Sequence, residues 1–256
     1  MATGALTEGS WATGVREETS PRLKARTAGF FYLITVVTGM FAEIGVRGKL
    51  IVRNDATATA HNIMTSEALY RWGFAADIIG GVCYVVVTLL LYELLRPVSR
   101  SLSLLAAFFS LVGIAIGCLA ALGHLAPVFL LANAHYLAPF TTQQLQSLAL
   151  LSLKLHAQGY LIALVFFGIY EVLLGYLIFR STFLPKTLGV LMALAGLAFL
   201  SNSFIGFISP PLANRVSDLV LPVDALGEIS LMLWLLVMGV NEAKWHSFAA
   251  HRNAAY

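Results

Sequence analysis

Six long apolar runs constrain what this chain can fold into more than any other feature of its sequence. They cover residues 28–46, 72–95, 102–131, 156–179, 187–208 and 221–240. An α-helix rises about 1.5 Å per residue, so about 20 residues cross a hydrocarbon core about 30 Å thick. Helices also satisfy their own backbone hydrogen bonds in lipid, and the short alternating strands of a membrane barrel are not seen. We therefore predict an all-α, polytopic transmembrane bundle of about six helices.

The composition excludes an ordinary soluble domain. Hydrophobic residues make up 59% of the chain and charged residues 11%, whereas soluble proteins carry about 25% charged residues. The formal net charge is +3, but the basic residues lie between the apolar runs and form no continuous stripe, which excludes nucleic acid as a partner. The expected surroundings are the lipid bilayer. No phosphate loop, nucleophile elbow or haem-attachment pair is present, so we expect no cofactor.

The polar ends frame the membrane domain. Residues 1–26 are interpreted as a disordered cytoplasmic tail, residues 27–240 as the transmembrane domain, and residues 241–256 as a second cytoplasmic tail. The first apolar run lacks a cleavage site and is expected to remain as a span. Lys and Arg are more numerous on the side that holds both termini, which places the termini in the cytoplasm and predicts a multi-pass protein of the inner (plasma) membrane.

The connections opposite the termini, which we call outer, are long enough for short amphipathic helices. Residues 54–70 contain the cap residues Asn54 and Asp55 before several apolar positions. A second outer helix is expected to begin at Thr141, because Thr141 and Gln144 match a capping box.

Ionisable and polar side chains within apolar runs are the candidates for a site, since each is unfavourable in lipid unless the bundle shelters it. The predicted topology brings such groups to the outer third of all six helices: Glu43, Asp77, His124, His156, Asn202, Asp224 and Glu228. Converging carboxylates and imidazoles permit proton relay, acid and base chemistry or cation binding. The spacing of the histidines matches no metal motif, so no metal site is predicted from the sequence.

Structural roles compete with functional ones at each candidate. Glu43 and Asp77 have Arg47 and Arg71 nearby for ion pairs, and His124 precedes Pro127, whose kink frees backbone groups.

Two carboxylates deeper in the sequence need their own interpretation. Asp224 follows Pro222 and suits the start of a helix, where a carboxylate interacts favourably with the positive end of the helix dipole. Glu228 lies one turn deeper on the same face, so its charge repels that of Asp224. Glu171 is expected toward the cytoplasmic side, paired with a buried donor.

A small-residue motif on the third run suits close helix packing. Gly113 and Gly117 form a Gly-x-x-x-Gly pattern, which serves packing inside a bundle or association between copies of the chain.

Three stretches occur in a characteristic order. They read RTAGFFYLITVVTGMFAE at residues 26–43, TATAHNIMTSEALYRWGFAADI at 57–78 and LHAQGYLIALVFFGIYEVLLGYLIFRSTFLPKTLGVLMALAGLAFLSNSF at 155–204. Together they resemble a bacterial integral membrane family catalogued as domain of unknown function 4386, over nearly all of residues 26–240. The resemblance implies a small bacterial membrane protein and carries over no catalytic residue.

Three functions remain open from the sequence. The first is a membrane protein that binds a small or lipidic ligand in a polar pocket near the outer face, with His124, Asn202 and Asp224 among its ligand-binding side chains. The second is an intramembrane enzyme acting on a lipid or isoprenoid, with Glu43, Asp77, His156 and Glu228 as acid, base or partner. The third is a structural membrane subunit whose polar groups serve helix association.

Overall fold

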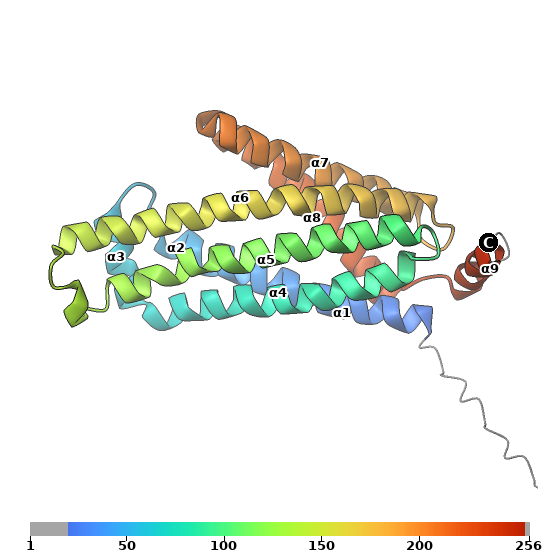
Figure 1. The fold of residues 1–256 in the computed structure, drawn as a ribbon, viewed down its shortest axis with the longest axis horizontal. Helices are drawn as coiled ribbons and strands as arrows, with labels where there is room; N and C mark the ends of the chain where they lie inside the picture. Colours follow the sequence, from blue (N-terminus) through green and yellow to red (C-terminus); the bar gives the residue numbers. More distant parts are fainter. Residues whose placement is uncertain (1–19, 254–256) are drawn as a thin grey trace, which may run out of the picture.

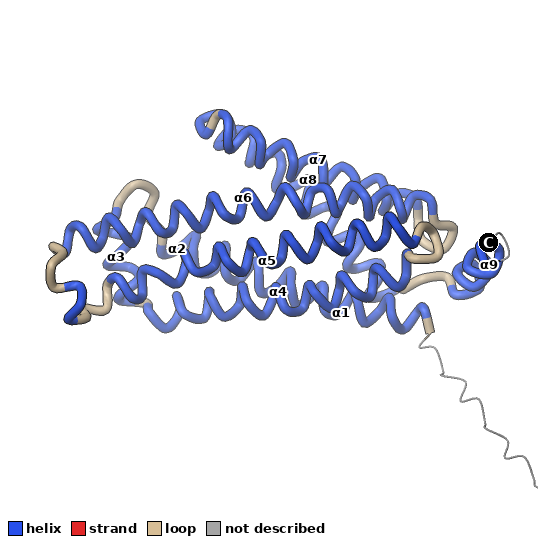
Figure 2. The backbone as a smooth tube through the Cα atoms, in the orientation of Figure 1, coloured by secondary structure: helices blue, strands red, loops and turns tan. Residues whose placement is uncertain are grey.

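The computed structural model describes the backbone of residues 20–253 and most of their side chains, and all regular structure within this range is helical. The elements are α1 (Pro21–Met40), a π-helical turn (Phe41–Arg47), α2 (Gly48–Leu50), α3 (Ala56–Thr65), α4 (Glu67–Leu95), α5 (Arg100–Leu130), a 3₁₀ turn (His135–Leu137), α6 (Thr142–Arg180), α7 (Lys186–Ile208), α8 (Pro210–Val237) and α9 (Glu242–Asn253). Figures 1 and 2 show the long helices running alongside one another, with most loops at the two ends. The all-α prediction is confirmed.

The long helices match the dimensions of a membrane. Within the described residues, five segments are long and apolar enough to cross one: Pro21–Leu50, Glu67–Leu95, Arg100–Leu130, Thr142–Arg180 and Lys186–Ile208. A sixth is counted when Pro222–Val237 and Glu242–Ala250, which meet at a bend of 99°, are taken together. Side chains such as Val82, Leu119 and Leu122 are more than half exposed on these helices, and only a lipid solvent makes such exposure favourable. The chain is therefore a multi-pass membrane protein.

The six long helices close into a ring. Each packs against the next in the order α1, α4, α5, α6, α7, α8, and α8 returns to α1. The interior on the side of α9 is filled by a large apolar cluster that includes Tyr32, Leu91, Leu174, Met192 and Leu231. A smaller cluster lies at the end that carries α3. This arrangement brings residues of α1, α6 and α8 together although they are far apart in sequence.

Glycines allow α6 and α7 to approach until their backbones touch. A Cβ on Gly175 would lie 2.5 Å from the carbonyl oxygen of Gly189, and a Cβ on Gly196 would lie 2.5 Å from that of Gly168. Such distances leave no room for any side chain, so this contact requires glycine.

The glycine motif of α5 faces the same neighbour. A Cβ on Gly113 would meet the ring of Phe167, and one on Gly117 would lie 4.0 Å from Ala163, both on α6. The motif therefore serves helix packing within the chain.

Several boundaries differ from those expected. The capping box at Thr141 is present, but it begins the 39-residue α6 itself rather than a separate outer helix. No helix-breaking residue separates the polar first turns of α6 from the apolar run that follows, so the helix is longer than the bilayer requires. Helix α1 begins at Pro21, inside the expected tail, and α9 occupies most of the second tail. The remainder of the two tails, residues 1–19 and 254–256, lies outside the described residues.

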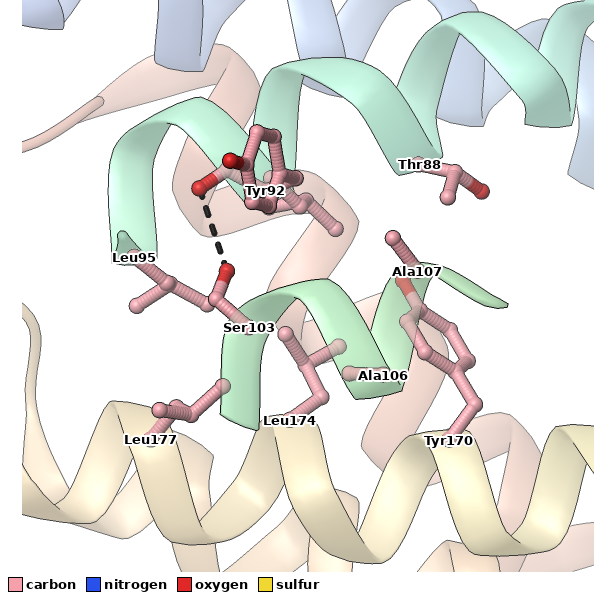
Figure 3. Close-up of a pocket in the computed structure, with 10 residues that line it drawn as sticks. Thr88, Tyr92, Leu95, Ser103, Ala106, Ala107, Tyr170, Leu174 and Leu177 are labelled. Carbon is pink, nitrogen blue, oxygen red and sulfur yellow. Dashed lines mark hydrogen bonds between the residues drawn. The ribbon is translucent and has the colours of Figure 1, made fainter. Parts of the chain in front are cut away.

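A small cavity lies between α4, α5 and α6, and Figure 3 shows its lining. Its volume of about 10 Å³ is near the smallest that holds one water molecule. Ser103 donates a hydrogen bond of 3.1 Å to the carbonyl oxygen of Tyr92 beside it. This cavity is too small for an organic ligand.

Candidate functional site

Two polar clusters link helices of the bundle. The first, which we call the arginine network, consists of Glu43, Arg47, Asp77, His124 and His156 near the end that carries α3. The second, which we call the carboxylate cluster, consists of Glu171 on α6 with Asp224 and Glu228 on α8.

Arg47 lies at the centre of the arginine network. It closes the π-helical turn that follows α1, a distortion often found at functional positions. Its Nη1 and Nη2 donate to Asp77 Oδ2 and Oδ1 at 2.5 and 3.2 Å, and its Nε donates to Glu43 Oε2 at 2.7 Å. The Arg47 and Asp77 side chains are 11% and 19% exposed, whereas that of Glu43 is 70% exposed. The buried part of this network is a bidentate ion pair between the π-helical turn and α4.

His124 is held on every side by protein groups. Its Nε2 lies 3.3 Å from the carbonyl oxygen of Tyr70, and its Nδ1 lies 3.4 Å from Arg47 Nη1. A carbonyl oxygen only accepts and a guanidinium only donates, so these contacts fit the neutral tautomer with its proton on Nε2. Tyr70 stacks on the imidazole at 4.2 Å and donates its hydroxyl proton to the His124 carbonyl oxygen.

His156 joins the same region from α6. Its Nδ1 lies 2.9 Å from the carbonyl oxygen of Ala120 and its ring lies 5.8 Å from that of His124. A carbonyl partner requires Nδ1 to be the protonated nitrogen, which links α6 to α5.

The structure therefore places four of the seven sequence candidates together: Glu43, Asp77, His124 and His156. Arg47, one of the two arginines considered, binds both Glu43 and Asp77, whereas Arg71 pairs with Glu67 on the helix surface. The other three lie elsewhere. Asn202 is partly exposed on α7, and Asp224 and Glu228 belong to the carboxylate cluster.

The carboxylate cluster joins α6 to α8 in the middle of the bundle. One oxygen from each of Glu171, Asp224 and Glu228 lies within 4.8 Å of the other two. Glu171 is fully buried, and neither of its carboxylate oxygens has a hydrogen-bond partner among the described residues. Asp224 is 9% exposed, and its Oδ1 also has no hydrogen-bond partner among the described residues. Glu171 thus lacks a donor group and is directed at two other acids, and it can share a hydrogen bond with Glu228 only when one of the two carries a proton.

Aromatic side chains surround this cluster. The hydroxyl of Tyr32 donates to Glu228 Oε1 at 3.0 Å. The Tyr32 ring contacts that of Tyr84 edge to face at 5.4 Å, and Tyr84 contacts Tyr170 in the same manner at 6.2 Å. These rings lower the local polarity, and the ion pairs shown among the described residues involve other carboxylates. Three negative charges in such surroundings are strongly unfavourable unless protons or a metal cation neutralise them.

Two sequence interpretations are corrected here. Glu171 does not pair with a buried donor; it lies against two other acids. Asp224 does not begin a helix, because α8 starts at Pro210 and Pro222 lies inside it. The sequence feature that marks the start of α8 is the Pro210–Pro211 pair, since proline favours the first turn of a helix.

Comparison with known proteins gives a family and no activity. The family model described as "Domain of unknown function (DUF4386)" matches residues 27–239. The chain is also similar to an uncharacterized protein of Archaeoglobus fulgidus, with 32% identity over 158 residues, which is 60% of this chain and 76% of that protein. No solved structure matches.

Proposed function

We propose that this chain, which belongs to the DUF4386 family, is an integral membrane protein that binds a small cation, a proton included, inside its helix bundle. The observation that carries the proposal is Glu171, a fully buried carboxylate with two unpaired oxygens facing two further carboxylates. Unpaired buried acids destabilise a fold, so a cluster of three is best explained by a ligand that neutralises it.

The arginine network fits a structural role better than a catalytic one. Both oxygens of Asp77 are bound by Arg47, and both ring nitrogens of His124 contact protein atoms. An enzyme using Glu43, Asp77, His156 and Glu228 together would need them in one place, whereas Glu228 lies in the other cluster. A lipidic ligand would need more space than the packed arginine network offers.

The orientation proposed from the sequence also suits this arrangement. Six crossings return the chain to its starting side, so both termini share one face, and the excess of Lys and Arg favours the cytoplasm. We place the protein in the plasma membrane on this basis, with Glu43 near the opposite surface.

Infrared difference spectroscopy on the purified protein in detergent micelles tests the proposal. The spectra are recorded between acidic and alkaline pH and followed at the carbonyl stretch of protonated carboxyl groups. We expect a band that persists at neutral pH in the wild type and is reduced in Glu171→Gln. The control is Glu67→Gln, which removes an exposed carboxylate of the surface pair with Arg71.

A neutral-pH carboxyl band that is the same in the wild type and in Glu171→Gln would overturn a cation-binding role for the cluster. So would the absence of both a protonated carboxyl band and any spectral response to added cations.

A further inference from the structure

The composition and geometry of the carboxylate cluster indicate which cation it takes. Its three side chains offer only oxygen, and the potential ligand atoms lie within 4.8 Å of one another. Oxygen-only sites suit hard divalent cations such as Mg²⁺, Mn²⁺ and Ca²⁺, whereas sites for softer ions use imidazole or thiolate ligands.

The spacing fits the size of these ions. Oxygen ligands on opposite sides of an ion lie about 4.6–5.2 Å apart for Ca²⁺ and about 4.0–4.2 Å apart for Mg²⁺, which is twice the usual metal–oxygen distance. An upper bound of 4.8 Å on the separation of the ligand oxygens admits either ion with small movements of flexible side chains.

We propose that Glu171, Asp224 and Glu228 form a divalent metal site that links α6 to α8. This inference rests on the proposed function, and it specifies that the neutralising cation is a metal ion as well as a proton. The second observation beyond the cluster of acids is the orientation of Glu171, which is fully buried and has no hydrogen-bond donor beside either oxygen among the described residues, yet faces the other two carboxylates.

The charges balance with one retained proton. If all three carboxylates were ionised, their charge of −3 would exceed the +2 of a divalent ion by one. When one carboxyl group keeps its proton, the two ionised carboxylates balance the ion. Metal uptake therefore displaces protons from the other two groups, so metal affinity rises with pH.

Tyr32 acts as a positioning residue in this site. Its hydroxyl donates to Glu228 Oε1 at 3.0 Å and leaves the other oxygen of that carboxylate for the metal ion. Hydrogen-bonded partners of this kind fix the orientation of a ligand without touching the metal. The contact also connects α1 to the site.

The experiment is a Mn²⁺ titration of the purified full-length protein in detergent micelles after treatment with a chelator. Free Mn²⁺ is measured by electron paramagnetic resonance. We expect the wild type and Glu67→Gln to bind one Mn²⁺ per chain, in competition with Mg²⁺ or Ca²⁺. Glu171→Gln and Glu228→Gln remove direct ligands, and their affinity should fall more than about 100-fold, beyond the range of changes in the surrounding shell.

Tyr32→Phe separates positioning from folding. Its Mn²⁺ affinity should fall about 10- to 100-fold with the stoichiometry unchanged, while its unfolding temperature without Mn²⁺ stays near that of the wild type. If Glu171→Gln is not monodisperse, Asp224→Asn replaces it, because Asp224 is less deeply buried than Glu171.

Binding of Mn²⁺ that survives in both Glu171→Gln and Glu228→Gln would overturn the metal site, and so would its absence from the wild type. If the wild type binds no Mn²⁺ but keeps the Glu171-dependent carboxyl band, the cluster holds protons only and the proposed function stands. Loss of both signals would remove both proposals.

Discussion

Arg47 and Asp77 join the π-helical turn that follows α1 to α4 through two hydrogen bonds of 2.5 and 3.2 Å, and neither side chain is more than one-fifth exposed. Removal of one partner leaves the other as an uncompensated charge in the bundle. Arg47→Gln is expected to destabilise the protein by about 3–5 kcal/mol, the range for breaking a buried pair. Thermal unfolding in detergent micelles measures this change.

The matched control is Arg71→Gln on the neighbouring helix surface. Arg71 and Glu67 form an ion pair of 2.7 Å, but their side chains are 53% and 52% exposed. Loss of this ion pair in Arg71→Gln should change the free energy of unfolding by no more than about 1 kcal/mol. Equal effects of the two variants would show that the Arg47 pair is solvated and does not hold α1 to α4.

The α6–α7 contact provides a second prediction. Gly175→Ala would place a Cβ 2.5 Å from a backbone oxygen of α7, so the helices must separate. The destabilisation should be about 1–3 kcal/mol or more. Gly39→Ala, where a Cβ meets nothing within 4 Å, should instead stabilise by about 0.4–1 kcal/mol because alanine restricts the unfolded chain.

The two glycine variants are compared by thermal unfolding under identical conditions. Unchanged stability of Gly175→Ala would mean that α6 and α7 do not pack through this face.

A third prediction concerns pH at the contact between the first residues of α1 and α9. The hydroxyl of Ser20, which caps α1, donates a hydrogen bond to the carboxylate of Glu242 at the start of α9. Protonation of this carboxylate weakens the hydrogen bond, because a charged acceptor binds a hydroxyl more strongly than a neutral one. Acid conditions below about pH 4 should therefore release α9 from α1.

Amide hydrogen exchange of α9 detects this release. The wild type should lose protection in acid relative to intrinsic rates, and Glu242→Gln should show reduced protection at neutral pH as well. Glu93→Gln is the control, because Glu93 pairs with Lys24 at 2.6 Å and ties α1 to α4 instead. Protection of α9 that is the same in the wild type and Glu242→Gln would contradict the prediction.

Much of the fold was predictable because apolar runs leave a chain few options in lipid. The helical class and most of the spans follow from run length, and the convergence of Asp77, His124 and His156 follows from their matching depths. Their detailed pairing did not follow. Arg47 reaches Asp77 through a π-helical turn, and no local pattern in the sequence identifies a single wide turn of this kind.

The carboxylate cluster was missed because of one helix boundary. Pro222 resembles a helix start, which placed Asp224 and Glu228 near the outer surface and far from Glu171. Helix α8 instead begins at Pro210, so both carboxylates lie in the middle of the bundle beside Glu171. A shift of about 11 residues corresponds to about 16 Å along a helix. Depth estimates in membrane helices are therefore only as accurate as the assigned ends.

The unfolding temperature of Glu171→Gln, measured without divalent cations, shows whether the carboxylate cluster is kept for binding at the expense of stability. Replacement of a buried ionisable group that lacks a partner is expected to leave stability unchanged or raise it, by about 1 kcal/mol or more. The unfolding temperature of Glu171→Gln should therefore lie at or above that of the wild type. A decrease as large as that of Arg47→Gln would contradict it, because Glu171 would then be a structural residue.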